Sequence, residues 1–187
     1  MSDSRLTLET AVTWLEEVLG QFPDPGIDLE QVEVVAAEDV PEAYGKLLVH
    51  THHMTVTLEE KYRNPVTLEA LKVRHEGDDY SRKLLLRSGD NGPIVLAGIM
   101  RFRLECVREA IRDSIIEGIT PLGRILIENE VLRRIETVAF LRFPLGNSFG
   151  HLFGDDVEEE FTYGRIAIIY CDGEPAVELL ELVQPGL

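Results

Sequence analysis

The chain opens with a hydrophobic pattern of helical period. Over residues 7–20, apolar side chains recur at every third or fourth position while glutamates fill the opposite face. The apolar positions are Leu8, Val12, Leu15, Val18 and Leu19. Gly20 follows the last of them, as is typical of a helix end. The pattern predicts one amphipathic helix here.

An acidic segment then interrupts the periodicity. Residues 21–40 combine prolines with many carboxylates and have no sustained apolar face, which predicts an irregular connector over the surface. The same composition would also suit a lid over a site. A short helix is expected from Pro41 to Val49, because proline is favoured in the first turn of a helix.

The apolar period next changes from a helical one to two. Four segments rich in Val, Ile, Thr and Leu are separated by Gly, Asn and Asp residues, which tolerate the backbone angles of tight turns. The segments are Met54–Tyr62, Pro65–His75, Tyr80–Arg87 and Pro93–Leu104. They predict a meander of four antiparallel strands.

Helical and strand patterns complete the chain. Helices are predicted at Glu105–Glu117 and Pro121–Asn129, and strands at Val131–Phe143, Gly164–Cys171 and Ala176–Val183. This order predicts an α+β class, a single antiparallel sheet with helices packed over it. We expect one domain over residues 1–187, with a helix and acidic connector at 1–46 and the core at 47–185.

Charge and composition narrow the classes of function. The 187 residues include 34 acidic and 18 basic side chains, a net charge of −16, which argues against nucleic-acid binding. Apolar stretches are far shorter than the roughly 20 residues that cross a bilayer, so no membrane insertion is expected. No secretory signal is recognisable, and Cys106 and Cys171 lie apart without metal or disulfide spacing. A cytoplasmic protein is the expectation.

Three charged residues are candidates for chemistry. In the strand at Tyr80–Arg87, alternation places Arg82 on the more apolar face, where a guanidinium requires an anionic partner. Glu178 and Glu181 interrupt the last strand and must point to opposite faces of the sheet. An inward carboxylate could act as an acid or as a hydrogen-bond partner, and a structural ion pair with Arg82 is the alternative.

Other motifs carry less information. His50, His52 and His53 have no further ligand at metal spacing, so capping or surface roles are favoured and no metal is expected. Thr120 and Pro121 begin a helix whose free N–H groups favour an anion, although an ordinary capped helix explains them as well.

Several of these motifs together resemble the chorismate pyruvate-lyase family. They are Thr120-Pro121-Leu122-Gly123-Arg124-Ile125-Leu126, Val131-Leu132-Arg133-Arg134, Tyr163-Gly164-Arg165, Gly173-Glu174-Pro175 and the stretch Glu181–Pro185. Upstream, His53-Met54-Thr55, Tyr80-Ser81-Arg82-Lys83 and Ala97-Gly98 match in the same order. The similarity runs from Leu47 to Pro185, whereas Leu145–Glu160 is longer than in compact members.

The resemblance implies a sheet of about six strands, a buried site closed by two flaps, and conversion of chorismate to 4-hydroxybenzoate and pyruvate without metal or organic cofactor. Arg82 would hold the ring carboxylate, and Glu181, or Glu178 by a different alignment, would meet the para hydroxyl. Substrate-binding positions carried over are Met54, Thr55, Gly98, Thr120, Leu122, Gly123 and Arg165.

The competing hypothesis is a relative of the same fold that acts on or senses another small aromatic or carboxylate ligand, as a tailoring enzyme or an effector-binding domain. Residues 1–46 show no two-helix pattern with basic recognition positions, which favours the lyase. The concerted or stepwise course of the reaction, the pathway of the product and the oligomeric state stay open.

Overall fold

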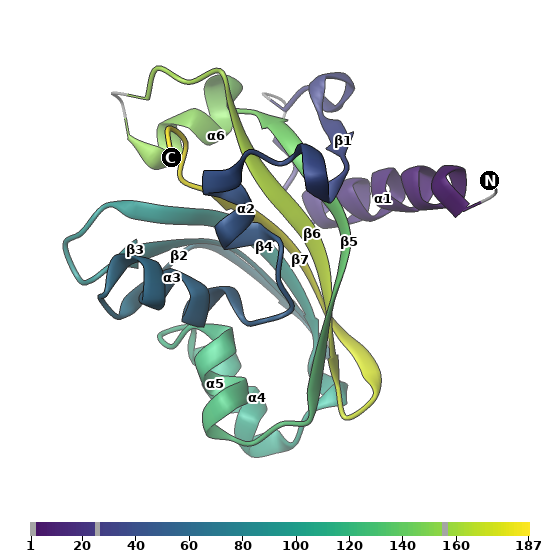
Figure 1. Ribbon diagram of the computed structural model, residues 1–187. Coiled ribbons are helices and arrows are strands. Elements are labelled where there is room, and N and C mark those ends of the chain that lie inside the picture. Colours follow the sequence, from purple (N-terminus) through teal and green to yellow (C-terminus); the bar gives the residue numbers. More distant parts are fainter. Residues whose placement is uncertain (1–2, 25–26, 155–156) are drawn as a thin grey trace.

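One antiparallel sheet of seven strands organises the molecule (Figure 1). The computed structural model describes residues 3–24, 27–154 and 157–187. Across the sheet the strand order is β1-β5-β6-β7-β4-β3-β2. The strands are β1 (Glu33–Val35), β2 (Val66–Glu76), β3 (Asp79–Ser88), β4 (Ile94–Arg103), β5 (Arg133–Pro144), β6 (Phe161–Cys171) and β7 (Glu174–Val183). The predicted α+β class with a single antiparallel sheet is confirmed.

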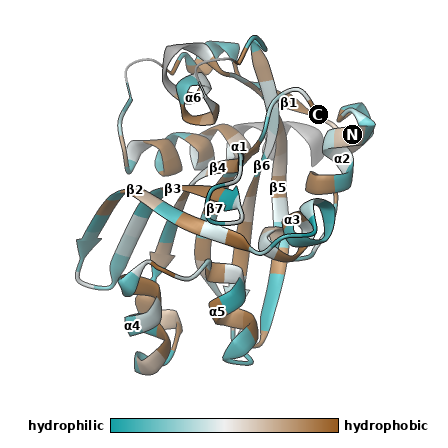
Figure 2. Ribbon diagram, turned by 90° about the vertical axis from the view of Figure 1, so that its left-hand side faces the viewer, coloured by the Kyte–Doolittle hydropathy of each residue, from teal (hydrophilic) through white to brown (hydrophobic). Residues whose placement is uncertain are grey.

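Helices cover both faces of this sheet (Figure 1). The α-helices are α1 (Asp3–Gly20), α2 (Glu42–Leu48), α3 (Met54–Tyr62), α4 (Glu109–Glu117), α5 (Leu122–Glu128) and α6 (Gly146–Phe153). Short 3-10 helices are η1 (Leu29–Gln31), η2 (Ala37–Asp39) and η3 (Leu104–Cys106). Each helix carries hydrophobic and hydrophilic stretches (Figure 2), as amphipathic helices on a sheet must.

The two faces of the sheet bury two separate hydrophobic clusters. One cluster joins the sheet to α2, α3, α4 and α5, and the other joins the opposite face to α1 and α6. Strand β3 shows how alternation divides them, because Tyr80, Leu84 and Leu86 belong to the first cluster and Leu85 to the second. Arg82 therefore lies on the first face, as the sequence predicts.

The segment Met54–Tyr62 is a helix, so the strand predicted there is wrong. Its alternating Thr and Val residues suggested a strand, but Met54, Thr55 and Leu58 are the buried positions and fit one face of a helix. The helix ends at Arg63, which has a left-handed backbone with φ of 53°. The meander therefore has three strands, β2, β3 and β4, and not four.

Two further elements were not predicted. Within the acidic connector, Glu33–Val35 forms β1 and pairs with β5 at the edge of the sheet, so the segment is not irregular throughout. Its residues 25–26 lie outside the described part. The extra length at Leu145–Glu160 contains α6, whose Phe149 is buried beside Phe143 in the cluster under α1. The helix expected from Glu105 begins four residues later, at Glu109, after η3.

Candidate functional site

A pocket lies between the first face of the sheet and the helices α3 and α5. Its cavity volume is about 60 Å³. Strands β3, β4 and β7 supply Arg82, Gly98 and Glu181, while the starts of α3 and α5 supply the roof. Most of the remaining lining is apolar: Leu68, Leu84, Leu86, Leu96, Ile99, Met100, Ile169, Leu179 and Leu180.

Arg82 is a buried cation with two unpartnered donor atoms. The residue is 1% exposed, and its Nε and Nη1 atoms have no hydrogen-bond partner within the described residues. Burial lowers the pKa of Arg82, and nearby Tyr80 works against that shift. A guanidinium nevertheless keeps its proton in proteins. Arg82 therefore brings to the pocket a positive charge that forms no ion pair with a carboxylate of the described residues.

Glu181, in contrast, already has a cationic partner. Arg165 on β6 is 1% exposed and donates from Nε to Glu181 Oε2 at 2.6 Å. Its Nη1 also donates to the backbone oxygens of Leu48 at 3.2 Å and His50 at 3.0 Å. Arg165 thus neutralises the pocket carboxylate and ties it to the end of α2 and the loop that follows.

His53 completes the polar lining of the pocket. It is 7% exposed, and its Nε2 atom has no hydrogen-bond partner within the described residues. Burial lowers the pKa of His53 to about 4, with smaller contributions from Arg133 and Arg165. The imidazole is therefore neutral at pH 7 and offers one unused hydrogen-bonding nitrogen.

The roof depends on a close approach between two helix starts. A Cβ atom on Gly123 of α5 would lie 2.9 Å from Thr55 Oγ1 and 3.1 Å from His53 Cβ of α3. An ion pair between Arg124 and Glu59 joins the same two helices. Glycine at position 123 lets α3 and α5 meet over the pocket.

Gly98 lies on the floor, opposite Glu181 in the β4–β7 pairing. A Cβ atom there would lie 2.8 Å from the Leu180 backbone oxygen. The packing of β4 against β7 thus requires a glycine at this position. The substrate-binding role of Gly98 that the resemblance implies stays a prediction.

Seven of the predicted site residues meet in this pocket: Arg82, Glu181, Met54, Thr55, Gly98, Leu122 and Gly123. Arg165 is not among the lining residues, but it donates a hydrogen bond to Glu181, which lines the pocket. Thr120 precedes the roof helix and does not line the pocket. We did not predict a site role for His53, since its burial depends on α3 and α5 meeting, which no local pattern reveals.

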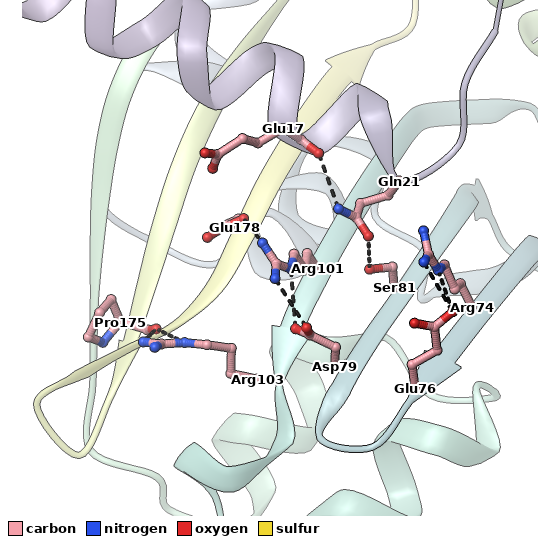
Figure 3. A network of polar contacts seen from close by, with 10 residues as sticks. All are labelled: Glu17, Gln21, Arg74, Glu76, Asp79, Ser81, Arg101, Arg103, Pro175 and Glu178. Carbon is pink, nitrogen blue, oxygen red and sulfur yellow. Dashed lines mark hydrogen bonds and ion pairs between the residues drawn. The ribbon is translucent and has the colours of Figure 1, made fainter.

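Glu178 lies on the other face of the sheet, below α1 (Figure 3). Its Oε2 is 3.8 Å from Arg101 Nη1, and Arg101 in turn binds Asp79 with two hydrogen bonds. Burial raises the pKa of Glu178, and Arg101 opposes this shift. The prediction that Glu178 and Glu181 point to opposite faces is confirmed, and the structure brings only Glu181 to the pocket.

Two other features bear on function. Among the described residues, no group of three or more His, Cys, Asp or Glu side chains is arranged to hold a metal ion. No helix in the described part of the chain is both long and apolar enough to cross a membrane.

Comparison with known proteins gives structural neighbours. No family model and no curated protein matches the sequence. PhnF from Mycobacterium smegmatis aligns with a TM-score of 0.50 and 10% identity over 73% of this chain. YydK from Bacillus subtilis subsp. subtilis str. 168, described as a possible transcriptional regulator, aligns with a TM-score of 0.45 and 9% identity over 95% of this chain and 94% of its own.

The chain spans 65% of the length of PhnF, so it matches about two thirds of that protein. At such low identity the likeness shows the fold alone. That fold is chorismate lyase-like, an α+β domain with one antiparallel sheet and helices over it.

The comparisons overturn the predicted activity. Neither neighbour is described as a lyase, and YydK is described as a possible transcriptional regulator, so the prediction of a chorismate pyruvate-lyase that forms 4-hydroxybenzoate and pyruvate is withdrawn, together with the classification as an enzyme. The predicted exclusion of nucleic-acid partners is withdrawn for the same reason. Physically, the matching motifs specify turns, helix starts and strand approaches, which belong to the fold and do not determine the chemistry.

Proposed function

We propose that this chain is a ligand-sensing domain that binds a small aromatic carboxylate in the pocket beneath α3 and α5. The observation that supports the proposal is Arg82, a cation buried in an apolar pocket with two unpartnered donor atoms. A buried charge without a partner costs several kcal/mol of desolvation. A ligand carboxylate would supply the missing partner in the bidentate geometry that guanidinium favours.

The other walls support the choice of ligand. Leucine and isoleucine side chains would cover a flat ring, and Glu181 would accept a hydrogen bond from a ring substituent. Because Arg165 neutralises Glu181, the pocket has one net positive charge and suits a monoanion.

Sensing is favoured by the connection between pocket and backbone. A ligand group on Glu181 would change the partner of Arg165, which also holds the carbonyls of Leu48 and His50. Those residues lead directly into the roof at His53. Occupancy of the pocket would in this way alter the α2–α3 segment without any chemical conversion of the ligand.

The first test is calorimetric titration with matched probes. Benzoate, phenylacetate and cinnamate provide rings with a carboxylate, benzamide provides a neutral isostere, and acetate lacks the ring. We expect an aromatic acid to bind at least about tenfold more tightly than benzamide, since a charge-assisted hydrogen bond contributes about 1.5–3 kcal/mol. Chromatography after incubation should recover the ligand unchanged.

The variant that tests the assignment is Arg82→Met, with Arg74→Met on the exposed edge strand as control, because Arg74 pairs with Glu76 outside the pocket. Arg82→Met should abolish binding and leave the free energy of unfolding equal or higher, since a buried unpaired charge is replaced by an apolar chain. Binding that survives in Arg82→Met, or no binding of any aromatic acid by the wild type, would refute the proposal.

A further inference from the structure

A second hollow adjoins the pocket and shares one wall with it. It is an open groove of about 1,000 Å³ between the loop before α3, the end of α5 and the start of β5. His53 lines both the groove and the Arg82 pocket, so its imidazole separates the two spaces. Apart from His53, the residues that line the groove are different from those of the pocket.

The groove is positively charged although the chain has a net charge of −16. Arg133, Arg134 and His52 line it, and Glu130 is the one acidic side chain among its described lining residues. This balance is the reverse of that of the whole molecule. It is the kind of local cation cluster that an anion requires where the overall field is repulsive.

The two arginines differ in what they already bind. Arg134 forms an ion pair with Glu136, and its guanidinium carbon lies 3.9 Å from the centre of the Tyr170 ring. Arg133 donates from Nη1 to the backbone oxygen of Val131 at 3.0 Å and has no carboxylate partner within the described residues. The charge of Arg133 is therefore not paired with a described carboxylate, and its guanidinium can donate further hydrogen bonds to a ligand.

His53 supplies an independent observation. Its side chain is more than nine-tenths buried and lines the groove, yet its Nε2 atom is unpartnered within the described residues. A buried polar atom without a partner costs about 1–3 kcal/mol, so a ligand that bonds to it recovers that free energy.

We propose that this groove is a second ligand site, which binds a small anion such as a phosphate or carboxylate group, with Arg133 supplying the charge and His53 Nε2 donating a hydrogen bond. The site lies beside the Arg82 pocket with His53 between them, and it does not depend on the function proposed for that pocket. Phosphate and carboxylate groups both present negatively charged oxygen atoms, which accept hydrogen bonds from guanidinium and imidazole N–H groups.

The test is NMR of the arginine Nε–H and histidine ring signals at pH 7 in the full chain. Inorganic phosphate and acetate are titrated separately at constant ionic strength set with sodium chloride. We expect saturable shifts of Arg133 and His53 while the Arg82 signal stays unchanged. Saturation by phosphate alone, by acetate alone or by both identifies the type of anion and supports the site in each case.

Two matched variants distinguish a specific anion site from non-specific attraction by the surface charge. Arg133→Gln should weaken binding by about tenfold or more, which corresponds to about 1.4 kcal/mol. Arg134→Gln removes the same formal charge from a residue already paired and should change affinity less than about twofold. Equal losses in both variants, shifts that never saturate, or shifts centred on Arg82 would overturn the proposal.

Discussion

Arg82 and Arg165 are the two largest fully buried side chains, and the protein treats their charges in opposite ways. Arg165 has a carboxylate and two backbone carbonyls as partners. Arg82 has free donors beside an apolar cavity. Since a structural arginine is normally satisfied by the protein itself, this contrast supports the proposed role of Arg82 in recognition, whereas the partners of Arg165 fit a structural role.

His53 makes stability depend on pH. Its pKa is about 4 in the folded protein and about 6.5 when exposed, because burial disfavours the imidazolium. Between pH 6.5 and pH 4 the His53 imidazole binds a proton in the unfolded chain but not in the folded chain, so the free energy of unfolding falls as the pH is lowered through this range. Above pH 6.5 this residue costs no stability, and below about pH 4 the expected loss reaches about 3 kcal/mol.

Denaturant unfolding at pH 7 and pH 4.5 measures this effect. His53→Gln removes the titrating group, so the loss of unfolding free energy between the two values should be smaller than in the wild type. His75→Gln, on the exposed edge strand, is the control and should keep the wild-type difference. An unchanged difference in His53→Gln would contradict the assigned pKa.

Sequence reasoning found some of these residues and missed others for a physical reason. Strand alternation is a local property, so it placed Arg82 on the apolar face and separated Glu178 from Glu181 correctly. The role of His53 depends on the contact between α3 and α5, which are far apart along the chain. No residue pattern near position 53 contains that information.

At the scale of elements, the roof is the part most sensitive to small changes. Gly123→Ala would place a methyl group 2.9 Å from Thr55 Oγ1 and 3.1 Å from His53 Cβ. The starts of α3 and α5 must then separate, at a cost of about 1–3 kcal/mol typical of overpacking. We expect a lower unfolding free energy together with weaker binding in the pocket, measured by thermal unfolding and calorimetry.

Gly45→Ala is the matched control for that substitution. Gly45 also lies in a helix, but an added Cβ would approach no atom closer than 3.8 Å. Alanine there should stabilise the protein by about 0.5–1 kcal/mol through helix propensity. If the two substitutions have the same effect on stability, the close approach of α3 and α5 does not limit the fold.

The element that sequence reasoning misjudged most is α3. Its Thr and Val residues favour strands locally, but burial of Met54 and Leu58 under the first core stabilises a helix instead. The short edge strand β1 was missed because three residues give no period to detect, and only pairing with β5 makes them a strand.

For the whole molecule, charge is the property with a direct experimental consequence. A net charge of −16 on 187 residues creates repulsion that favours expansion of the folded state. Raising sodium chloride from about 10 mM to about 0.5 M shortens the screening length from roughly 30 Å to below 10 Å. The midpoint of thermal unfolding should therefore rise with salt, and a midpoint that falls would mean that attractive ion pairs dominate.

The architecture of the whole chain followed from the sequence more closely than its activity did. Helix and strand periods predicted the α+β sheet, because packing against one layer imposes those periods on every segment. The chemistry depends on whether buried groups are partnered, as in Arg82 against Arg165. Two sequences can share every turn and helix start of this fold and differ in that respect.

The roof also has a consequence for timing. A ligand bound beneath α3 and α5 would be covered by helix starts that an ion pair joins, so separation of these helices would assist both its entry and its exit. Entry and exit then share the same slow opening step, and their rates change together while the equilibrium affinity does not. Such a protein would respond to the average ligand concentration over many opening events and would ignore brief fluctuations.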